Sequence, residues 1–331
     1  MPARALVTGA SGFIGSALVR RLKRDGAFVR ALVRSAPDST SSGADDVVAA
    51  DLTAPLDERA LAGIDVIYHL AAKTHDTHEA AGAAADYTRI NVDATRALVE
   101  AAVRQRIPRF VYVSSVKAMD EGGPGMRDES QPPAPETAYG RTKLAAERAV
   151  FEVASRGGVA PVCLRFPMVY GPGQRGNLAN MIRAVDRGRF PPPPETGNRR
   201  SMLHVENAVD GLLLAGRHDA APGQTYLVTD ANPYSTRELY DWIRAALGRR
   251  AIQWSVPVWG FRALALAGDA ARTIVRHRIG FDSDAFQKLL GSAWYSPAKM
   301  SRELGYQPAH DLRAALPELV ADYRSRQGSG A

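Results

Sequence analysis

Residues 5 to 16 read Ala-Leu-Val-Thr-Gly-Ala-Ser-Gly-Phe-Ile-Gly-Ser, and this stretch decides the fold. A short apolar run ends in three glycines, Gly9, Gly12 and Gly15, and a helix-compatible segment follows them. Glycines let a backbone approach a pyrophosphate closely, and the unpaired N–H groups at a helix start attract its charge. The stretch therefore predicts the strand, tight turn and helix of a dinucleotide-binding unit.

Composition limits the class of protein. The chain has 331 residues, of which 45% are hydrophobic and 23% charged, enough for a full core and a second lobe. Its single cysteine, Cys163, excludes an internal disulfide and is typical of a reducing compartment. The N-terminus lacks a signal-peptide pattern, and no apolar run approaches the ~18 residues of a membrane span. We therefore expect a soluble cytoplasmic protein.

The net charge of +7 indicates an anionic partner. The basic residues are scattered over helices rather than clustered with aromatic residues, which argues against a nucleic-acid surface. A small diphosphate ligand would need only two or three of them. We expect such a ligand and no nucleic acid.

The second predicted strand, Phe28–Val33, ends at Arg34. Units that bind NAD usually place an acidic residue here to accept from the ribose hydroxyls. A guanidinium suits a 2′-phosphate instead, so Arg34 favours NADP(H), with NAD(H) possible. The alternative is an ordinary solvated loop arginine.

Two further predicted strands end in residues that can meet a dinucleotide. The strand over Val47–Ala50 leads into Asp51 and Leu52, and Asp51 could accept from an adenine amino group. The strand over Asp65–Leu70 is a nearly continuous apolar run of the buried parallel type. Ala71 and Ala72 follow it, and small residues at this edge again permit close approach.

The next segments are a loop and a helix. Lys73–Asp86 is polar and rich in alanine, and it contains His75 and His78 without further ligands nearby, so we predict no metal site. Helical periodicity covers Arg89–Arg106, with Asn91 near its start.

A tyrosine and a lysine carry the chemical signal. A predicted strand over Phe110–Val113 delivers Ser114 and Ser115 to the carboxyl edge of the sheet, where ligands of open α/β sheets bind. Tyr139 then opens a helix that runs to about residue 155, and Lys143 lies on the same helix face.

An ammonium beside a phenol stabilises the phenolate and lowers a pKa that is ordinarily about 10. We therefore expect Tyr139 to act as an acid or base, Lys143 to lower its pKa, and Ser115 to orient the reacting oxygen.

As a set, these segments resemble the extended short-chain dehydrogenase/reductases, in the branch of NAD-dependent epimerases and dehydratases that act on nucleotide sugars. The resemblance covers nearly the whole chain. The matching segments are Thr8-Gly9-Ala10-Ser11-Gly12-Phe13-Ile14-Gly15, His69-Leu70-Ala71-Ala72, Asn91-Val92, Ser114-Ser115, Tyr139 with Lys143, Leu164-Arg165-Phe166-Pro167-Met168-Val169-Tyr170-Gly171-Pro172, Arg200-Ser-Met-Leu-His204-Val and Leu-Gly-Tyr306-Gln-Pro308.

The resemblance implies roles for individual residues. Tyr139 is implied as the acid/base, Lys143 as the ligand of the nicotinamide ribose, and Ser115 as the third catalytic member. The predicted cofactor residues are Gly9, Ser11, Gly12, Phe13, Ile14, Gly15, Arg34, Asp51, Leu52, Leu70, Ala71, Ala72, Asn91, Ser114, Tyr139, Lys143, Phe166, Met168 and Val169. The predicted substrate residues are Ser115, Asn177, Leu178 and Arg200, the last three for a nucleotide diphosphate.

We expect a Rossmann-type doubly wound parallel sheet over residues 1–172, to which some later segments return. A smaller α/β substrate lobe is expected over 173–325, followed by a flexible tail over 326–331. The lobe would include a helix over Val205–Gly216, a strand over Gln224–Val228 and a helix over Ser235–Leu247, with Ser235 or Thr236 as N-cap.

The segment Val256–Ile279 combines apolar residues with arginines. A basic amphipathic helix can lie on a membrane surface, but such faces usually pack into a core, and we favour packing on the lobe. Around Lys288–Trp294 the chain lacks the arginine with which 4-epimerases bind the diphosphate, and Lys288 could substitute for it.

The predicted reaction is hydride transfer at C4 of a UDP-sugar. Arg34 narrowly favours a UDP-4-keto-sugar reductase, and the alternative is a UDP-hexose 4-epimerase acting on UDP-glucose or UDP-N-acetylglucosamine. A dehydratase is disfavoured because Val116 and Lys117 replace the usual acidic pair, and a non-catalytic sensor because Tyr139 and Lys143 are both present. The resemblance implies a homodimer through the Arg89 and Tyr139 helices.

Overall fold

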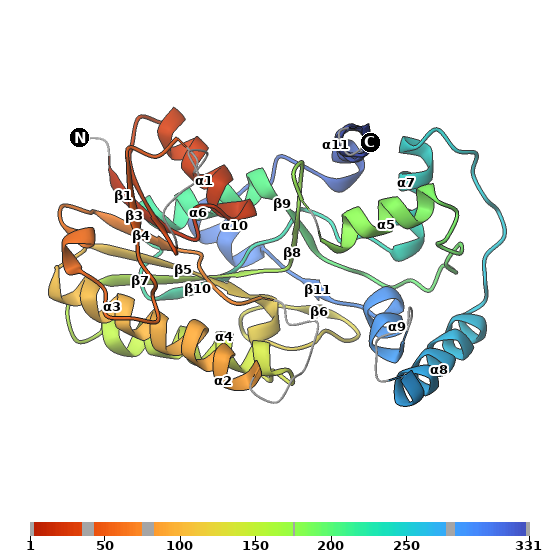
Figure 1. Cartoon of the computed structure of the whole chain (residues 1–331), viewed down its shortest axis with the longest axis horizontal. Helices are drawn as coiled ribbons and strands as arrows, with labels where there is room; N and C mark the ends of the chain where they lie inside the picture. Colours follow the sequence, from red (N-terminus) through yellow and green to blue (C-terminus); the bar gives the residue numbers. More distant parts are fainter. Residues whose placement is uncertain (1–2, 35–42, 75–82, 175, 276–281, 329–331) are drawn as a thin grey trace.

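The computed structural model describes residues 3–34, 43–74, 83–174, 176–275 and 282–328 (Figure 1). A seven-stranded parallel sheet in the order β10-β7-β5-β4-β1-β2-β3 forms its centre. Its strands are β1 (Arg4–Thr8), β2 (Phe28–Val33), β3 (Asp46–Ala49), β4 (Val66–His69), β5 (Arg109–Ser115), β7 (Ala160–Phe166) and β10 (Gln224–Leu227). The predicted Rossmann-type fold is thereby confirmed.

Helices cover both faces of this sheet (Figure 1). On one face α1 (Phe13–Arg24) packs against α6 (Val205–Arg217), and on the other α3 (Ala94–Arg104) packs against α4 (Ala138–Ala154). The strands are largely apolar along their length because successive side chains point to opposite sides, and both faces of the sheet are buried under helices. In β1, for example, Val7 belongs to the first core and Leu6 to the second.

The order of the strands places the ligand-binding edge. The chain moves from β1 outward to β2 and β3, and then returns to β4 on the other side of β1. Such a reversal opens a crevice at the carboxyl ends of the two neighbouring strands, where open α/β sheets bind their ligands. The turns after β1 and β4 therefore share one edge.

The expectation that the later helix and strand build the substrate lobe is wrong. β10 pairs in parallel with β7 and extends the main sheet, while α6 packs on α1 beneath it. These elements belong to the large sheet because their apolar residues, Tyr226 and Leu212 among them, complete its first core.

A third apolar cluster lies apart from the sheet. It joins α5 (Asn177–Asp186), α7 (Thr236–Ala246) and α11 (Leu312–Gly328). Ser235 is the N-cap of α7, and it forms a complete capping box with Glu238, as the first of our two alternatives predicted. The flexible tail expected from residue 326 is wrong for 326–328, which continue α11; residues 329–331 lie outside the described part.

Short elements link the two regions. Two pairs of short parallel strands occur: β8 (Met168–Tyr170) with β9 (Met202–His204), and β6 (Met126–Arg127) with β11 (Trp294–Tyr295). The remaining α-helices of the described part are α2 (Ala83–Tyr87), α8 (Val258–Val275), α9 (Ser283–Leu290) and α10 (Ala298–Leu304).

The helix predicted over Arg89–Arg106 is divided. A π-helical turn spans Thr88–Asp93, and α3 begins only at Ala94. Such turns are rare and are often found at functional sites. His75 and His78 lie outside the described residues.

Close backbone contacts require glycines in the turn after β1. Gly9 has φ of +67°, in the left-handed region that favours glycine. A Cβ on Gly15 would lie 2.1 Å from the carbonyl oxygen of Gly9, so α1 meets the turn without room for a side chain. The turn is closed by the N–H of Gly12, which donates to the same carbonyl over 2.9 Å.

We predict that Gly15→Ala lowers the free energy of unfolding by about 1–3 kcal/mol or more, because the added methyl group overpacks the turn. Dinucleotide affinity should fall with it. Chemical denaturation and a fluorescence titration with NADPH measure the two effects. Ser16→Ala is the matched control, since it removes only the bond from the Ser16 hydroxyl to the Phe13 carbonyl. Equal stability of the two variants would contradict the prediction.

Candidate active site

The start of α1 is built to receive an anion. Gly12 is its N-cap, no side chain caps the exposed N–H groups, and the first turn contains no acidic residue. Basic residues occupy the last turn instead, as a helix dipole prefers. The turn that begins at Gly9 therefore leads into N–H groups that can bind a pyrophosphate.

A buried polar network supports this turn from below. The Thr8 hydroxyl hydrogen-bonds Nδ1 of His69 over 2.7 Å, and His69 Nε2 pairs with the Thr95 hydroxyl over 2.9 Å. The oxygen of Thr8 also accepts from the N–H groups of Leu70 and Ala71, which ties the ends of β1 and β4 together. Burial lowers the pKa of His69 to about 3, so the imidazole is neutral. Sequence reasoning missed Thr95 because its partner is distant in the chain.

Ser115 and Tyr139 lie together at the end of β5. The Ser115 side chain acts to lower the pKa of Tyr139, and the ring of Tyr87 lies 6.0 Å from that of Tyr139. Gly140 makes this approach possible, because a Cβ there would lie 2.2 Å from the carbonyl oxygen of Lys117. Helix α4 can therefore touch the turn that follows Ser115.

Lys143 is buried one helical turn further along. Its ammonium donates to the Val113 carbonyl over 2.7 Å and lies 4.2 Å from the centre of the Tyr112 ring. Burial lowers the pKa of Lys143 to about 7, while the charge of Glu147 raises it.

The structure does not give Tyr139 the lowered pKa expected from the sequence. Burial raises the pKa of Tyr139 to about 12 and outweighs the opposing hydrogen bond with Ser115. The physical reason is that Lys143 directs its ammonium to a backbone carbonyl and is itself destabilised as a cation. The sequence showed the spacing of the pair but not the cost of desolvating it.

Glu147 anchors a buried ionic cluster beside Lys143. Arg165 on β7 contacts its carboxylate over 2.7 Å, and the side chains of this ion pair are only 7% and 4% exposed. The Ser114 hydroxyl donates to the same carboxylate. The side chain of Ser114 is therefore bonded within the core. Only the backbone of Ser114 remains available for the predicted contact with a cofactor.

Asn91 also has a structural partner. Its side chain accepts from the N–H of Lys73 over 2.8 Å and donates to the Lys73 carbonyl and to Thr142. It thus ties the segment after β4 to α4. The predicted cofactor residue acts in this structure by positioning the neighbouring backbone.

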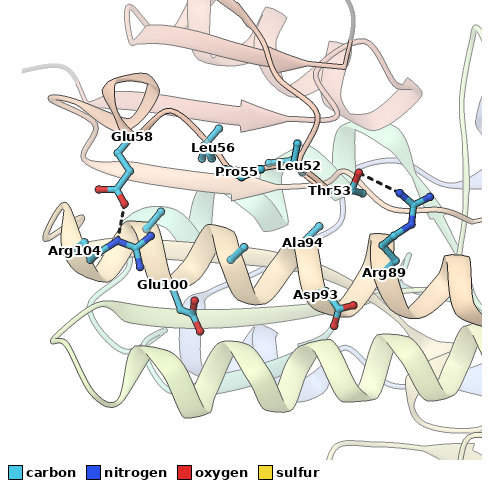
Figure 2. Close-up of a pocket in the computed structure, with 13 residues that line it drawn as sticks. Leu52, Thr53, Pro55, Leu56, Glu58, Arg89, Asp93, Ala94, Glu100 and Arg104 are labelled. Atoms are coloured by element: carbon cyan, nitrogen blue, oxygen red, sulfur yellow. Dashed lines mark hydrogen bonds and ion pairs between the residues drawn. The ribbon is translucent and has the colours of Figure 1, made fainter.

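The predicted adenine and ribose residues lie at the ends of β2 and β3. Arg34 is exposed, and its charge helps to lower the pKa of Asp51, although the hydrogen bonds from Thr53 contribute more. The carboxylate of Asp51 already accepts from the N–H and hydroxyl of Thr53. A cavity of about 500 Å³ begins at Leu52 and runs along α3 (Figure 2).

Figure 2 shows this cavity between the segment 52–58 and α3, with Arg104 bound to Glu58 at one end and Arg89 to Thr53 at the other. Leu52 is the one predicted site residue among those that line it. The cavity is separate from Tyr139.

The residues predicted to flank the nicotinamide differ in exposure. Phe166 is 3% exposed and packs in the core, whereas Met168 is 36% exposed at the start of β8. Val169 is half-buried. The buried Phe166 ring is therefore poorly placed to contact a nicotinamide ring directly.

The predicted diphosphate residues lie at the start of α5 and beside β11. Asn177 is exposed, whereas the side chain of Leu178 is 1% exposed in the third apolar cluster, so only the backbone of Leu178 can bind a ligand. Gly176 caps α5 without a side-chain bond. Arg200 donates to the Gly291 carbonyl over 2.9 Å, and desolvation lowers the pKa of Arg200.

The seven-stranded parallel sheet and the glycine turn after β1 are typical of the Rossmann-type enzymes of the short-chain dehydrogenase class. The family model of the NAD dependent epimerase/dehydratase family matches residues 5–229, and the chain belongs to this family. Homologues in it include NAD-dependent epimerases, dehydratases and reductases.

Individual relatives cover nearly the whole chain. UDP-glucose 4-epimerase of Vibrio cholerae is 30% identical over 97% of this chain and 95% of its own length. A ketoreductase of Stigmatella aurantiaca that acts on a farnesyl quinoline oxide is 31% identical over 92% of this chain and 91% of its own. The structure of MoeE5 in complex with UDP-glucose and NAD is 29% identical, covers 98% of this chain and 100% of that one, and superposes with a TM-score of 0.76.

We predict that Tyr139→Phe reduces turnover about 10²–10⁴-fold, because the proton donor and acceptor is lost. Dinucleotide affinity should remain within a factor of about two, since the ring is kept. Steady-state rates and a fluorescence titration measure these effects. Tyr87→Phe, the neighbouring ring, serves as the control. Full activity in Tyr139→Phe would overturn the acid/base assignment.

Glu147→Gln is expected to shift the pH profile of the reductive reaction. Removing the carboxylate removes the charge that raises the pKa of Lys143, so the ammonium is lost at lower pH. The alkaline limb of log(kcat/KM) should therefore move to lower pH. Unfolding should also require less denaturant, because Arg165 is left buried without its partner.

Glu152→Gln on the exposed side of α4 is the matched control. An unchanged pH profile in Glu147→Gln, with the fold confirmed by circular dichroism, would show that Glu147 does not act on Lys143.

Proposed function

We propose that this protein transfers a hydride at C4 of a UDP-sugar. The observation that carries the proposal is the meeting of Ser115, at the carboxyl end of β5, with Tyr139 and Lys143, one turn apart on α4, where Gly140 lets the helix approach the Lys117 carbonyl. A nicotinamide dinucleotide supplies the hydride when bound. The uncapped start of α1 and the side-chain-free approach of Gly9 and Gly15 fit its pyrophosphate.

The chain's own groups would handle the proton. In the reductive direction Tyr139, which is protonated at neutral pH and stays so at higher pH because burial raises its pKa, donates to the developing alkoxide. Ser115 orients the same oxygen by its hydroxyl. Lys143, whose ammonium is held at the Val113 carbonyl, would bind the nicotinamide ribose.

The UDP-sugar is supported by relatives and by local geometry. MoeE5 binds UDP-glucose and UDP-glucuronic acid together with NAD in its solved structures. In this chain the uncapped start of α5 offers N–H groups at Asn177 and Leu178, and the Arg200 guanidinium lies beside β11. We propose that these groups bind the diphosphate.

Between the two outcomes of the chemistry, we favour a UDP-4-keto-sugar reductase that uses NADPH. Arg34 is exposed where β2 ends and brings positive charge to the place of the usual carboxylate. A UDP-hexose 4-epimerase is the second candidate, favoured by the likeness to the Vibrio cholerae enzyme and by the NAD bound to MoeE5.

Two incubations, one with a 4-keto sugar and one with UDP-glucose, distinguish these outcomes. Under anaerobic conditions the protein is mixed with NADPH and a UDP-4-keto-6-deoxy sugar, and the nicotinamide absorbance is followed. We expect loss of one NADPH for each sugar reduced. Interconversion of UDP-glucose and UDP-galactose without net change in cofactor would establish the epimerase instead.

Arg34→Ala tests the cofactor preference in the same assay. We expect KM for NADPH to rise by about tenfold, since one charge-assisted contact to the 2′-phosphate is lost. KM for NADH should stay unchanged. Arg24→Ala, an exposed arginine at the end of α1, is the control.

We also propose a division of labour along the chain. Residues 1–172, with α6 and β10, would hold the dinucleotide, and the cluster of α5, α7 and α11 would belong to the substrate side. A homodimer through α3 and α4 is the arrangement we propose for the assembly in the cytoplasm.

A further inference from the structure

Helix α8 presents large apolar side chains to solvent. Trp259 is 74% exposed, Leu266 60% and Leu264 50%, and Val258 at the helix start is 43% exposed. Trp254, shortly before the helix, is 63% exposed. These five are most of the large apolar residues found exposed in the described part of the chain; Met126 and Met168 are the others. Figure 1 shows α8 beside α9 at the periphery, away from the central sheet.

Packing on the rest of the protein uses only one stripe of this helix. Phe261 and Ala265, four residues apart, are 2% and 1% exposed. Trp259 and Leu266, seven residues apart, lie together on the outward side, and Ala263, Ala267 and Ala270 lie there with them and are also exposed. We call these five residues the outer face of α8. The sequence expectation that the apolar residues pack on the lobe therefore holds for one stripe and is wrong for the outer face.

The stretch of sequence that contains α8 is rich in positive charge. Residues 249–280 contain six arginines and a single acidic residue, Asp269, a net charge of +5 in a chain whose total is +7. Arg262 is exposed on α8 itself. The carboxylate of Asp269 accepts hydrogen bonds from the N–H and hydroxyl of Ser283, so it is turned toward α9.

We propose that the outer face of α8, with Trp254, docks on the surface of an anionic lipid bilayer. Tryptophan and leucine would enter the boundary between headgroups and acyl chains, and the arginines would meet the lipid phosphates. A second copy of the chain is the less favourable occupant, because it would bring the same positive charge against this one. Among the described residues no helix is long and apolar enough to cross a membrane, so the contact would be peripheral.

Vesicle sedimentation tests the proposal with the full-length protein. One set of vesicles contains phosphatidylcholine alone, and the other contains phosphatidylcholine with phosphatidylglycerol. We expect binding to the anionic vesicles, weakened by high salt, together with a blue shift of tryptophan fluorescence. Binding to neither set would overturn the proposal.

Variants then locate the surface. Trp259→Ser with Leu266→Ser should weaken partitioning by at least about tenfold, and Arg262→Ala should weaken it less. Met126→Ser, which removes an exposed apolar residue elsewhere, and Arg24→Ala are the matched controls. Unchanged vesicle binding in the double variant would show that another surface binds lipid and would overturn the proposal.

The remaining outcome is self-association. A dimer in gel filtration that dissociates in the Trp259→Ser and Leu266→Ser variant, without any vesicle binding, would assign the face to a second copy and overturn a lipid partner. Dinucleotide affinity in solution should be the same in this variant, because α8 lies outside the predicted cofactor residues. A failure of the proposed reaction therefore leaves the lipid proposal untouched.

Discussion

The buried ammonium of Lys143 is the constraint on which the site depends. A cation in the core is stable only with compensating partners, and the chain supplies a carbonyl at 2.7 Å, an aromatic face and the nearby charge of Glu147. Glu147 is in turn held by Arg165, so the end of β5, the middle of α4 and β7 must assemble together. The same assembly brings Tyr139 to Ser115. The arrangement of the proposed catalytic residues thus follows from the partners that the buried Lys143 requires.

A second network prepares the dinucleotide edge in the same way. His69 is neutral and bonded on both sides by threonine hydroxyls, so it contributes rigidity without contributing charge. The Thr8 hydroxyl accepts two backbone N–H groups after β4, which fixes the turn against the segment at Leu70 and Ala71. Glycines stand where these backbones come closest, because a side chain there would clash with the neighbouring segment. Anion-binding N–H groups are therefore presented on a stiff support.

Helix α8 differs from the candidate active site in the side chains that it exposes to water. The candidate active site holds its charges in buried polar networks, whereas α8 leaves tryptophan, leucine and Arg262 exposed to water. Exposed apolar surface of this kind is costly for a protein that has no use for it. The pattern is consistent with one region specialised for chemistry and another for attachment.

The sequence by itself determined the features that depend on neighbouring residues. The glycine turn, the i, i+4 pair of Tyr139 and Lys143 and the cap at Ser235 are local patterns, and the parallel sheet followed from apolar runs that alternate with helices. The interactions that produce these features involve residues that are close together in the sequence.

Only the tertiary structure decided how those residues behave. The pKa of Tyr139 is raised rather than lowered, Ser114 turns to Glu147, Leu178 is buried, and β10 joins the main sheet. Each result depends on desolvation or on partners far away in sequence. Thr8 and His69, which form a hydrogen bond, are likewise 61 positions apart. Burial and long-range pairing exist only once the chain has folded, and no local pattern encodes them.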